Sequence, residues 1–220
     1  MELTAATSAR VDQDHLHTII DSDPSVPDRT TAILAGQSAP AAPIRRGLDR
    51  LVSWGADVLA VPCNTAHYFI DEFVDELPVP LVHIVEATLD EAQRRNPDGA
   101  WVTATTGTMR TRLYQRAAER RGYTLHEPSE EIQASVMDLI GVVKSGSLTD
   151  AGEMYRAVIE ELRDVNDLPV IMACTEIPLA FNYSGLSDDI AVSSLTSLAE
   201  ATYLKAAQLN SSTDAAKSAR

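Results

Sequence analysis

Apolar and polar positions along this chain follow two periods in turn. Short runs rich in Val, Ile, Leu and Ala alternate with longer stretches in which apolar residues recur every three to four positions. This alternation of strands and amphipathic helices predicts an α/β protein with parallel sheets. Strands are predicted at 15–20, 56–61, 81–85, 123–126, 169–173 and 190–192, with a further one beginning at Trp101.

The clearest turn signal in the chain, Pro97-Asp98-Gly99, predicts a division into two parts. We expect two similar Rossmann-like lobes whose parallel sheets face each other across a cleft. The N-terminal lobe is predicted to take residues 1–97 and the C-terminal lobe residues 98–192. A last helix at about 193–210 is predicted to return to the N-terminal lobe. The small, polar tail 211–220 is predicted to be disordered.

The two cysteines of the chain, Cys63 and Cys174, occupy equivalent places in the two predicted lobes. Each follows an apolar run of strand length and precedes a predicted helix. Ligands of open α/β sheets bind at the carboxyl ends of the strands, and the N–H groups of a helix N-terminus favour a thiolate. One thiol from each lobe predicts chemistry on two faces of one small molecule, as racemisation at a carbon requires. The alternative is two buried cysteines that act as small hydrophobic residues.

Composition limits the partners and the compartment. A formal net charge of −14 over 220 residues argues against nucleic acid and anionic membrane surfaces as partners. The first fifteen residues lack an apolar core, and no run approaches the length of a membrane span. The two cysteines show no C-x-x-C spacing. We therefore expect a cytoplasmic protein with reduced thiols and no metal, whose acidic substrate would need basic residues close by.

The sequence around both cysteines resembles the signatures of the aspartate/glutamate racemase family, over nearly the whole chain. Pro62–His67 and Ala173–Leu179 are similar to its two cysteine motifs, while Asp12–His15 and Val26–Thr30 are similar to its aspartate racemase branch. The resemblance implies a racemase without pyridoxal phosphate or any other cofactor. Its substrate would be an acidic amino acid, aspartate ahead of glutamate, and the protein would form a homodimer.

The resemblance also implies roles for individual residues. Cys63 and Cys174 would alternate as thiolate base and thiol acid, one for each direction of the reaction. Arg29 would bind a substrate carboxylate with its guanidinium fork, and Lys144 would bind one from the helix before the second cysteine strand. Each of these two cations could instead be a solvated surface residue.

Polar residues beside the cysteines complete the predicted site. N–H groups and hydroxyls at Asn64, Thr65 and Thr175 would stabilise charge on the α-carboxylate as the substrate becomes enolate-like. Resemblance to a Thr-x-Gly-Thr loop places Thr105 and Thr108 near the substrate, although a plain helix cap explains these residues nearly as well. His67 and Glu176 follow their cysteines closely enough to assist proton transfer, and an ordinary place on a helix surface is equally compatible with both.

The chain departs from the family pattern at two places. It starts inside the first helix of the family, so the N-terminal lobe is expected to lack its first strand and Gly-rich loop and to be less stable than a longer form. Ser193–Thr196 stands where the family has an Asp-Pro-Thr-like turn.

Two other functions remain open from the sequence. A related enzyme of the same fold could isomerise or decarboxylate a similar acid, because fold does not settle the reaction. A catalytically impaired paralogue could bind an acidic metabolite without turning it over. Exchange of the substrate α-proton with solvent separates the active from the inactive case.

Overall fold

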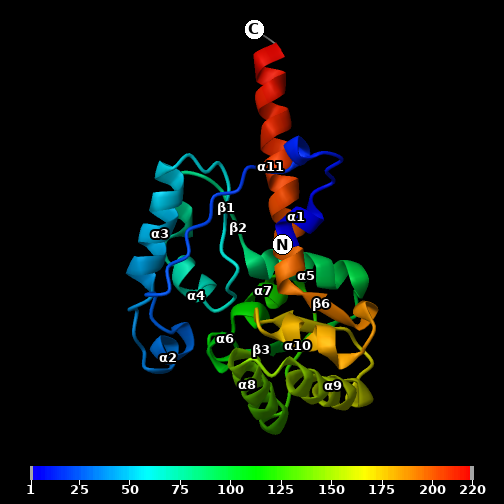
Figure 1. Ribbon diagram of the computed structural model, residues 1–220. Helices are drawn as coiled ribbons and strands as arrows, with labels where there is room; N and C mark the ends of the chain where they lie inside the picture. The colour runs from blue at the N-terminus through cyan, green and yellow to red at the C-terminus, as the bar shows by residue number, and fades with distance from the viewer. Residues whose placement is uncertain (1, 219–220) are drawn as a thin grey trace.

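The computed structural model describes residues 2–218, with the side chains of 212–218 left aside, and shows two α/β lobes with parallel sheets (Figure 1). The larger, C-terminal lobe has a four-stranded parallel sheet in the order β4-β3-β5-β6. Its strands are β3 (Ala100–Ala104), β4 (Leu125–His126), β5 (Val170–Ala173) and β6 (Ala191–Ser193). Every residue of β3 and β5 is buried, as expected for parallel strands covered on both faces.

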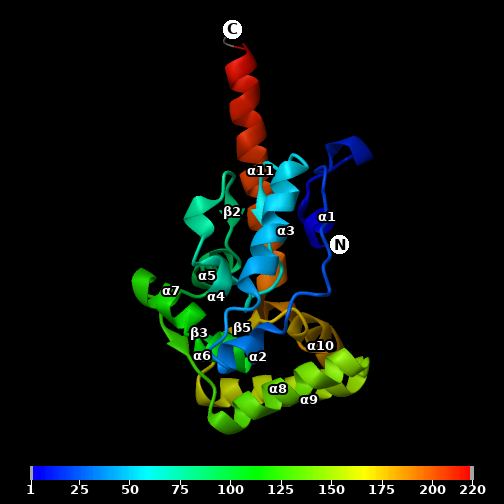
Figure 2. The same cartoon turned by 90° about the vertical axis from the view of Figure 1, so that its left-hand side faces the viewer.

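Side chains of the central strands alternate between two layers of helices. Trp101, Val170 and Met172 pack against helices on one face: α8 (Glu130–Ser145), α9 (Leu148–Val165) and α10 (Ile177–Ser184). Val102 and Ile171 face the other layer, formed by α5 (Ile84–Arg95) and α7 (Leu113–Arg121). Figure 2 shows α8 and α9 side by side below the sheet. Burial of each such side chain stabilises the fold by ~1.5–3 kcal/mol. The two clusters of this lobe hold more buried side chains than the N-terminal cluster, so the main core lies here.

The N-terminal lobe has a much smaller sheet. It pairs the two-residue strands β1 (Leu59–Ala60) and β2 (Leu81–Val82) in parallel. Its helices are α2 (Arg29–Leu34), α3 (Ala41–Ser53) and α4 (His67–Ile70), and its core includes Leu48, Leu59 and Ile70. Asp28 caps α2 by accepting a hydrogen bond from the Thr31 N–H at 2.7 Å, and α3 ends before Gly55.

Three predictions for the N-terminal lobe are wrong. Residues 15–20 form no strand, because their backbone has no ladder partner in the described residues, and the Ile20 side chain is 80% exposed. The strand predicted at 81–85 ends at Val82, since Ile84 already begins α5. The helix after Cys63 is a single turn of four residues that starts only at His67. The first two corrections concern the small sheet of this lobe, in which only two strands of two residues each are paired.

The last helix joins the two lobes. α11 (Ser194–Ser218) contacts strands of both sheets as well as α5, and the short N-terminal helix α1 (Glu2–Ala6) lies beside it (Figure 1). The chain predicted to be a disordered tail from 211 continues this helix to Ser218, because no Gly or Pro interrupts it. Residues 219–220 of that predicted tail lie outside the described residues. In the described part of the chain, no helix is long and apolar enough to cross a membrane.

Candidate active site

Cys174 lies at the carboxyl end of β5 and is surrounded by groups that keep it protonated. Its side chain is 7% exposed, and its Sγ donates to Glu176 Oε2 at 3.0 Å. Burial, the negative charge of Glu176 and the nearby Cys63 together raise the pKa of the Cys174 thiol. Hydrogen bonds from Asn64 to Ser194 and from Ser194 to the Met172 carbonyl oxygen connect the segments that carry Cys63 and Cys174. The structure thus brings the segments of the two cysteines together from different lobes, and their shared catalytic role stays a prediction.

The loop that carries Cys63 is fixed by a buried histidine. His67 Nδ1 lies 3.0 Å from the Cys63 carbonyl oxygen, and His67 Nε2 accepts the Ile84 N–H at 3.4 Å. Since Nε2 accepts, Nδ1 carries the proton and donates to the carbonyl. Burial, reinforced by the neighbouring His83, lowers the pKa of His67 to about 3. The structure therefore uses both ring nitrogens of His67 to hold the backbone at Cys63.

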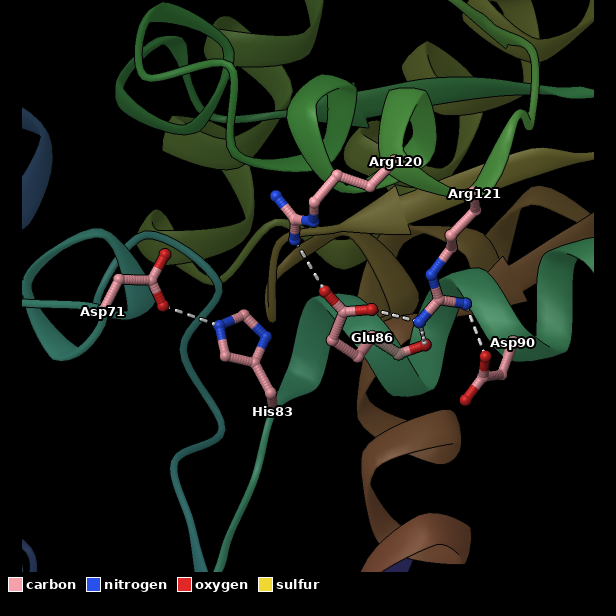
Figure 3. A network of polar contacts seen from close by, with 6 residues as sticks. All are labelled: Asp71, His83, Glu86, Asp90, Arg120 and Arg121. Carbon is pink, nitrogen blue, oxygen red and sulfur yellow. Dashed lines mark hydrogen bonds and ion pairs between the residues drawn. The ribbon is translucent and has the colours of Figure 1, made fainter. Parts of the chain in front are cut away.

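A second histidine connects this loop to a surface ion-pair network. The rings of His83 and His67 meet edge to face, with their centroids 4.5 Å apart. His83 Nε2 bonds to Asp71 Oδ1 at 2.9 Å, beside the pairs that Glu86 makes with Arg120 and Arg121 (Figure 3). These contacts tie the start of α5 to the end of α4 and to α7.

Three threonine hydroxyls join the Cys63 loop to the C-terminal lobe. Thr65 Oγ1 lies 3.0 Å from Thr105 Oγ1 and 2.9 Å from Thr108 Oγ1, and the latter two are 3.1 Å apart. Thr105 also caps α6 (Thr106–Arg110) by accepting the Thr108 N–H at 3.2 Å. The capping role and the approach to the cysteine loop thus occur together in the predicted Thr-x-Gly-Thr segment.

The side chain of Asn64 is held between residues of the C-terminal lobe and the start of α11. Its Oδ1 accepts a hydrogen bond from the Tyr114 hydroxyl at 2.6 Å, and its Nδ2 donates to Ser194 Oγ at 3.0 Å. With its side chain so engaged, Asn64 can offer a ligand its backbone. Ser194 also donates to the Met172 carbonyl oxygen at 2.8 Å.

Lys144, one of the two predicted carboxylate anchors, pairs with the carboxylate that accepts from Cys174. Lys144, at the end of α8, has a 59% exposed side chain and forms an ion pair with Glu176 Oε1 at 3.7 Å. Its charge also lowers the pKa values of Glu176 and of Asp28, after the hydrogen bonds that each carboxylate accepts. Lys144 is thus held beside Glu176, the hydrogen-bond partner of Cys174. Thr175 donates to Glu176 Oε2 at 2.9 Å.

Arg29 lies where a glycine allows the two lobes to meet closely. A Cβ atom on Gly107 of α6 would lie 2.8 Å from Thr30 Oγ1 and 3.0 Å from Thr30 Cα, which is too close for a side chain. The Arg29 Nη1 atom contacts the carbonyl oxygens of Val26 (3.4 Å) and Pro27 (3.3 Å). In the described residues, no ion pair commits its guanidinium to a carboxylate, so a substrate could bind there.

The sequence of the chain was compared with known families. The sequence model of the Asp/Glu/hydantoin racemase family matches residues 1–209. The chain belongs to this family.

Similar proteins of this racemase family include enzymes for different amino acids. The broad specificity amino-acid racemase RacX of Bacillus subtilis (strain 168) is 31% identical over 133 residues, which is 60% of this chain and 57% of that protein. The glutamate racemase of Corynebacterium kroppenstedtii is 31% identical over 60% of this chain and 46% of its own. The chain thus spans about half the length of the curated relatives it matches.

Solved structures of racemases share the fold. The aspartate racemase of Picrophilus torridus superimposes with a TM-score of 0.80 and 27% identity, covering 94% of this chain and 86% of that one. A putative Asp/Glu racemase from Yersinia pestis superimposes with a TM-score of 0.72 and 22% identity, covering 93% of this chain and 90% of that one. At this identity the likeness shows only that the two proteins share a fold.

Sequence reasoning missed three residues of this racemase-family site. Ser194 follows a strand at the same sheet edge as Cys174, so the rule that sites gather at strand ends could have found it. Gly107 was predicted only as part of a loop, since nothing in the sequence shows its contact with Thr30. Tyr114 carries no sequence signal, because a tyrosine at helical spacing reads as core. In the part of the chain that the structure describes, no cluster of His, Cys, Asp or Glu could hold a metal ion.

Proposed function

We propose that this chain racemises an acidic amino acid without a cofactor, aspartate ahead of glutamate, with Cys63 and Cys174 as the two proton-transfer groups. The observation that carries the proposal is the pair itself. The two cysteines of the chain come from different lobes, yet hydrogen bonds from Asn64 through Ser194 to Met172 hold their segments together. Membership of the racemase family supports the reaction class.

The reaction breaks and remakes one C–H bond. In one direction the Cys63 thiolate takes the α-proton, and the electron pair of that bond delocalises into the α-carboxylate as an enolate-like intermediate. The Cys174 thiol then delivers its proton to the opposite face of the α-carbon. The sulfur atoms end with their roles exchanged, so the next turnover runs in the reverse direction or resets by exchange with water. The pair titrates as one coupled system.

Electrostatics in the structure favour Cys174 as the first proton donor. Its raised pKa keeps the proton on sulfur, and the hydrogen bond to Glu176 orients that proton. A substrate carboxylate that attracts Lys144 away from Glu176 would weaken the ion pair between them, while Arg29 would bind the second carboxylate. Backbone N–H groups near Asn64, Thr65 and Thr175 would stabilise the developing charge. The two anchors offset the acidic background of the chain.

A panel of L- and D-amino acids tests the proposal. The purified chain, without added pyridoxal phosphate, is incubated with each amino acid in deuterated water. We expect loss of optical rotation and one α-deuterium for each inversion, with aspartate or glutamate fastest. Deuterium uptake by none of the amino acids, together with binding of an acidic one, would favour the impaired paralogue. The homodimer and the cytoplasmic location that we expect for such an enzyme are tested separately, by light scattering and cell fractionation.

A further inference from the structure

A line of buried hydrogen bonds connects the loop that carries Cys63 to the strand that carries Cys174. Asn64, directly after Cys63, donates from Nδ2 to Ser194 Oγ at 3.0 Å. The Ser194 hydroxyl donates to the carbonyl oxygen of Met172, two residues before Cys174, at 2.8 Å. We propose that Ser194 is a positioning residue that fixes the spacing of the two thiols, and that Tyr114 locks the Asn64 side chain in the orientation this requires.

The directions of these hydrogen bonds follow from the groups involved. A carbonyl oxygen can only accept, so the single Ser194 hydroxyl proton points at Met172, and Ser194 Oγ must accept from Asn64. This sets the Asn64 amide with nitrogen toward Ser194 and oxygen toward Tyr114, whose hydroxyl donates at 2.6 Å. The reversed amide would place its oxygen against Ser194 Oγ with no proton between them. One arrangement of Asn64 therefore satisfies all three partners.

Burial makes the bridge resistant to displacement. Ser194 and Tyr114 are fully buried, and Asn64 is 2% exposed. Water has no access to replace a bond that opens, so a shift of either loop leaves buried polar groups without partners. Burial also raises the pKa of Tyr114, which keeps its hydroxyl protonated and donating. The register of β5 and β6 adds to this, because Met172 pairs with Ser193, the residue before Ser194.

Spacing matters because inversion and abstraction make different demands on the two thiols. One thiol alone can remove the α-proton and return a solvent-derived one to the same face. Inversion also needs the second thiol in place on the opposite face during the lifetime of the intermediate. A misplacement of ~1 Å can cost on the order of 100-fold in rate, so a loosened bridge would reduce inversion more than exchange. This inference rests on the proposed two-thiol racemisation.

The test measures inversion and retentive exchange together. L- and D-aspartate are incubated in deuterated water with the parent, Ser194→Ala and Tyr114→Phe, and chiral separation with mass spectrometry gives both rates. We expect the ratio of inversion to exchange with retention to fall at least fivefold in both variants. Ser197→Ala is the control for Ser194, since it removes the hydroxyl of a buried α11 residue that donates to Ser193 O at 2.9 Å. Tyr123→Phe is the control for Tyr114, since its buried hydroxyl bonds to Asn96 O at 3.0 Å.

Both controls are expected to keep the parental ratio even where they lower the melting temperature, because loss of folded protein scales both rates equally. A second measurement needs no substrate: amide hydrogen exchange of residues 63–67 should become faster in Ser194→Ala and stay parental in Ser197→Ala. An active parent with an unchanged ratio in Ser194→Ala, or unchanged amide exchange there, overturns the positioning role alone. A parent that neither inverts nor exchanges any amino acid overturns the proposed function as well.

Discussion

At the scale of single residues, the site combines groups held in one protonation state by burial. His67 is kept neutral so that it can donate to the Cys63 carbonyl and accept from Ile84. Cys174 is kept protonated by burial and by Glu176. The candidate side chains thus divide between the thiols proposed to transfer protons and residues such as His67 that hold the backbone beside them.

The buried state of His67 predicts acid sensitivity of the fold. Its pKa is about 3 in the native state against an ordinary value of 6.5, so the unfolded chain binds a proton that the folded chain excludes. The stability from this group is complete above pH 6.5 and is lost as the pH falls toward 3, at about 1.4 kcal/mol per pH unit. Melting temperatures measured across this range should show the loss. His67→Gln should have a shallower slope by about one proton, and an equal slope would contradict the buried, neutral histidine.

The two cations predict the preference for acidic substrates. Removing the charge in Arg29→Met or Lys144→Met should leave the melting temperature nearly unchanged, because neither side chain is buried. A charge-assisted hydrogen bond to substrate is worth ~1.5–3 kcal/mol, so kcat/KM for aspartate should fall roughly ten- to a hundredfold. Arg46→Met and Lys205→Met are controls that lie outside the predicted site and should keep parental kinetics. Parental kinetics in both Arg29→Met and Lys144→Met would show that these residues do not bind the substrate and are solvated surface cations.

At the scale of elements, the sequence predicted the C-terminal lobe well and the N-terminal lobe poorly. β3, β5 and β6 lie where continuous apolar runs predict them, because a strand covered on both faces has one consistent pattern. Residues 15–20 have an alternating pattern but pair with no strand among the described residues, and a strand forms only where a partner completes its hydrogen bonds. The local pattern carries no information about whether such a partner lies alongside.

The close contact between α2 and α6 predicts the effect of a larger side chain at Gly107. Gly107→Ala would place a methyl group against Thr30 and push α2, with Arg29, away from the site. We expect a loss of ~1–3 kcal/mol from overpacking and a raised KM for aspartate. Gly141→Ala in α8 is the control, since nothing lies within 4 Å of its added Cβ, and it should gain about 0.5–1 kcal/mol from helix propensity. Chemical unfolding and steady-state kinetics measure both, and a stabilised Gly107→Ala with parental KM would contradict the close packing.

At the scale of the whole molecule, the sequence indicated the proposed proton-transfer groups better than the residues that support them. Cys63 and Cys174 could be predicted because both follow strands at the edge where ligands bind. Ser194 could have been found by the same rule, because it follows β6 at that edge. Tyr114 could not, because its role arises from a contact with Asn64, which lies 50 residues away in the chain. The central proposal is that two thiols act on opposite faces of the substrate α-carbon. It depends on the contacts that bring the Cys63 loop to the end of β5.

The most direct measurement of this claim follows inversion and α-deuterium uptake of L- and D-aspartate in deuterated water with the parent, Cys63→Ala and Cys174→Ala. We expect the parent to invert both enantiomers with one deuterium per inversion, and each variant to lose inversion. Each variant should still exchange the α-proton of one enantiomer, and the two variants should exchange opposite enantiomers. Inversion at the parental rate by either variant, or exchange of the same enantiomer by both, would contradict the two-thiol mechanism.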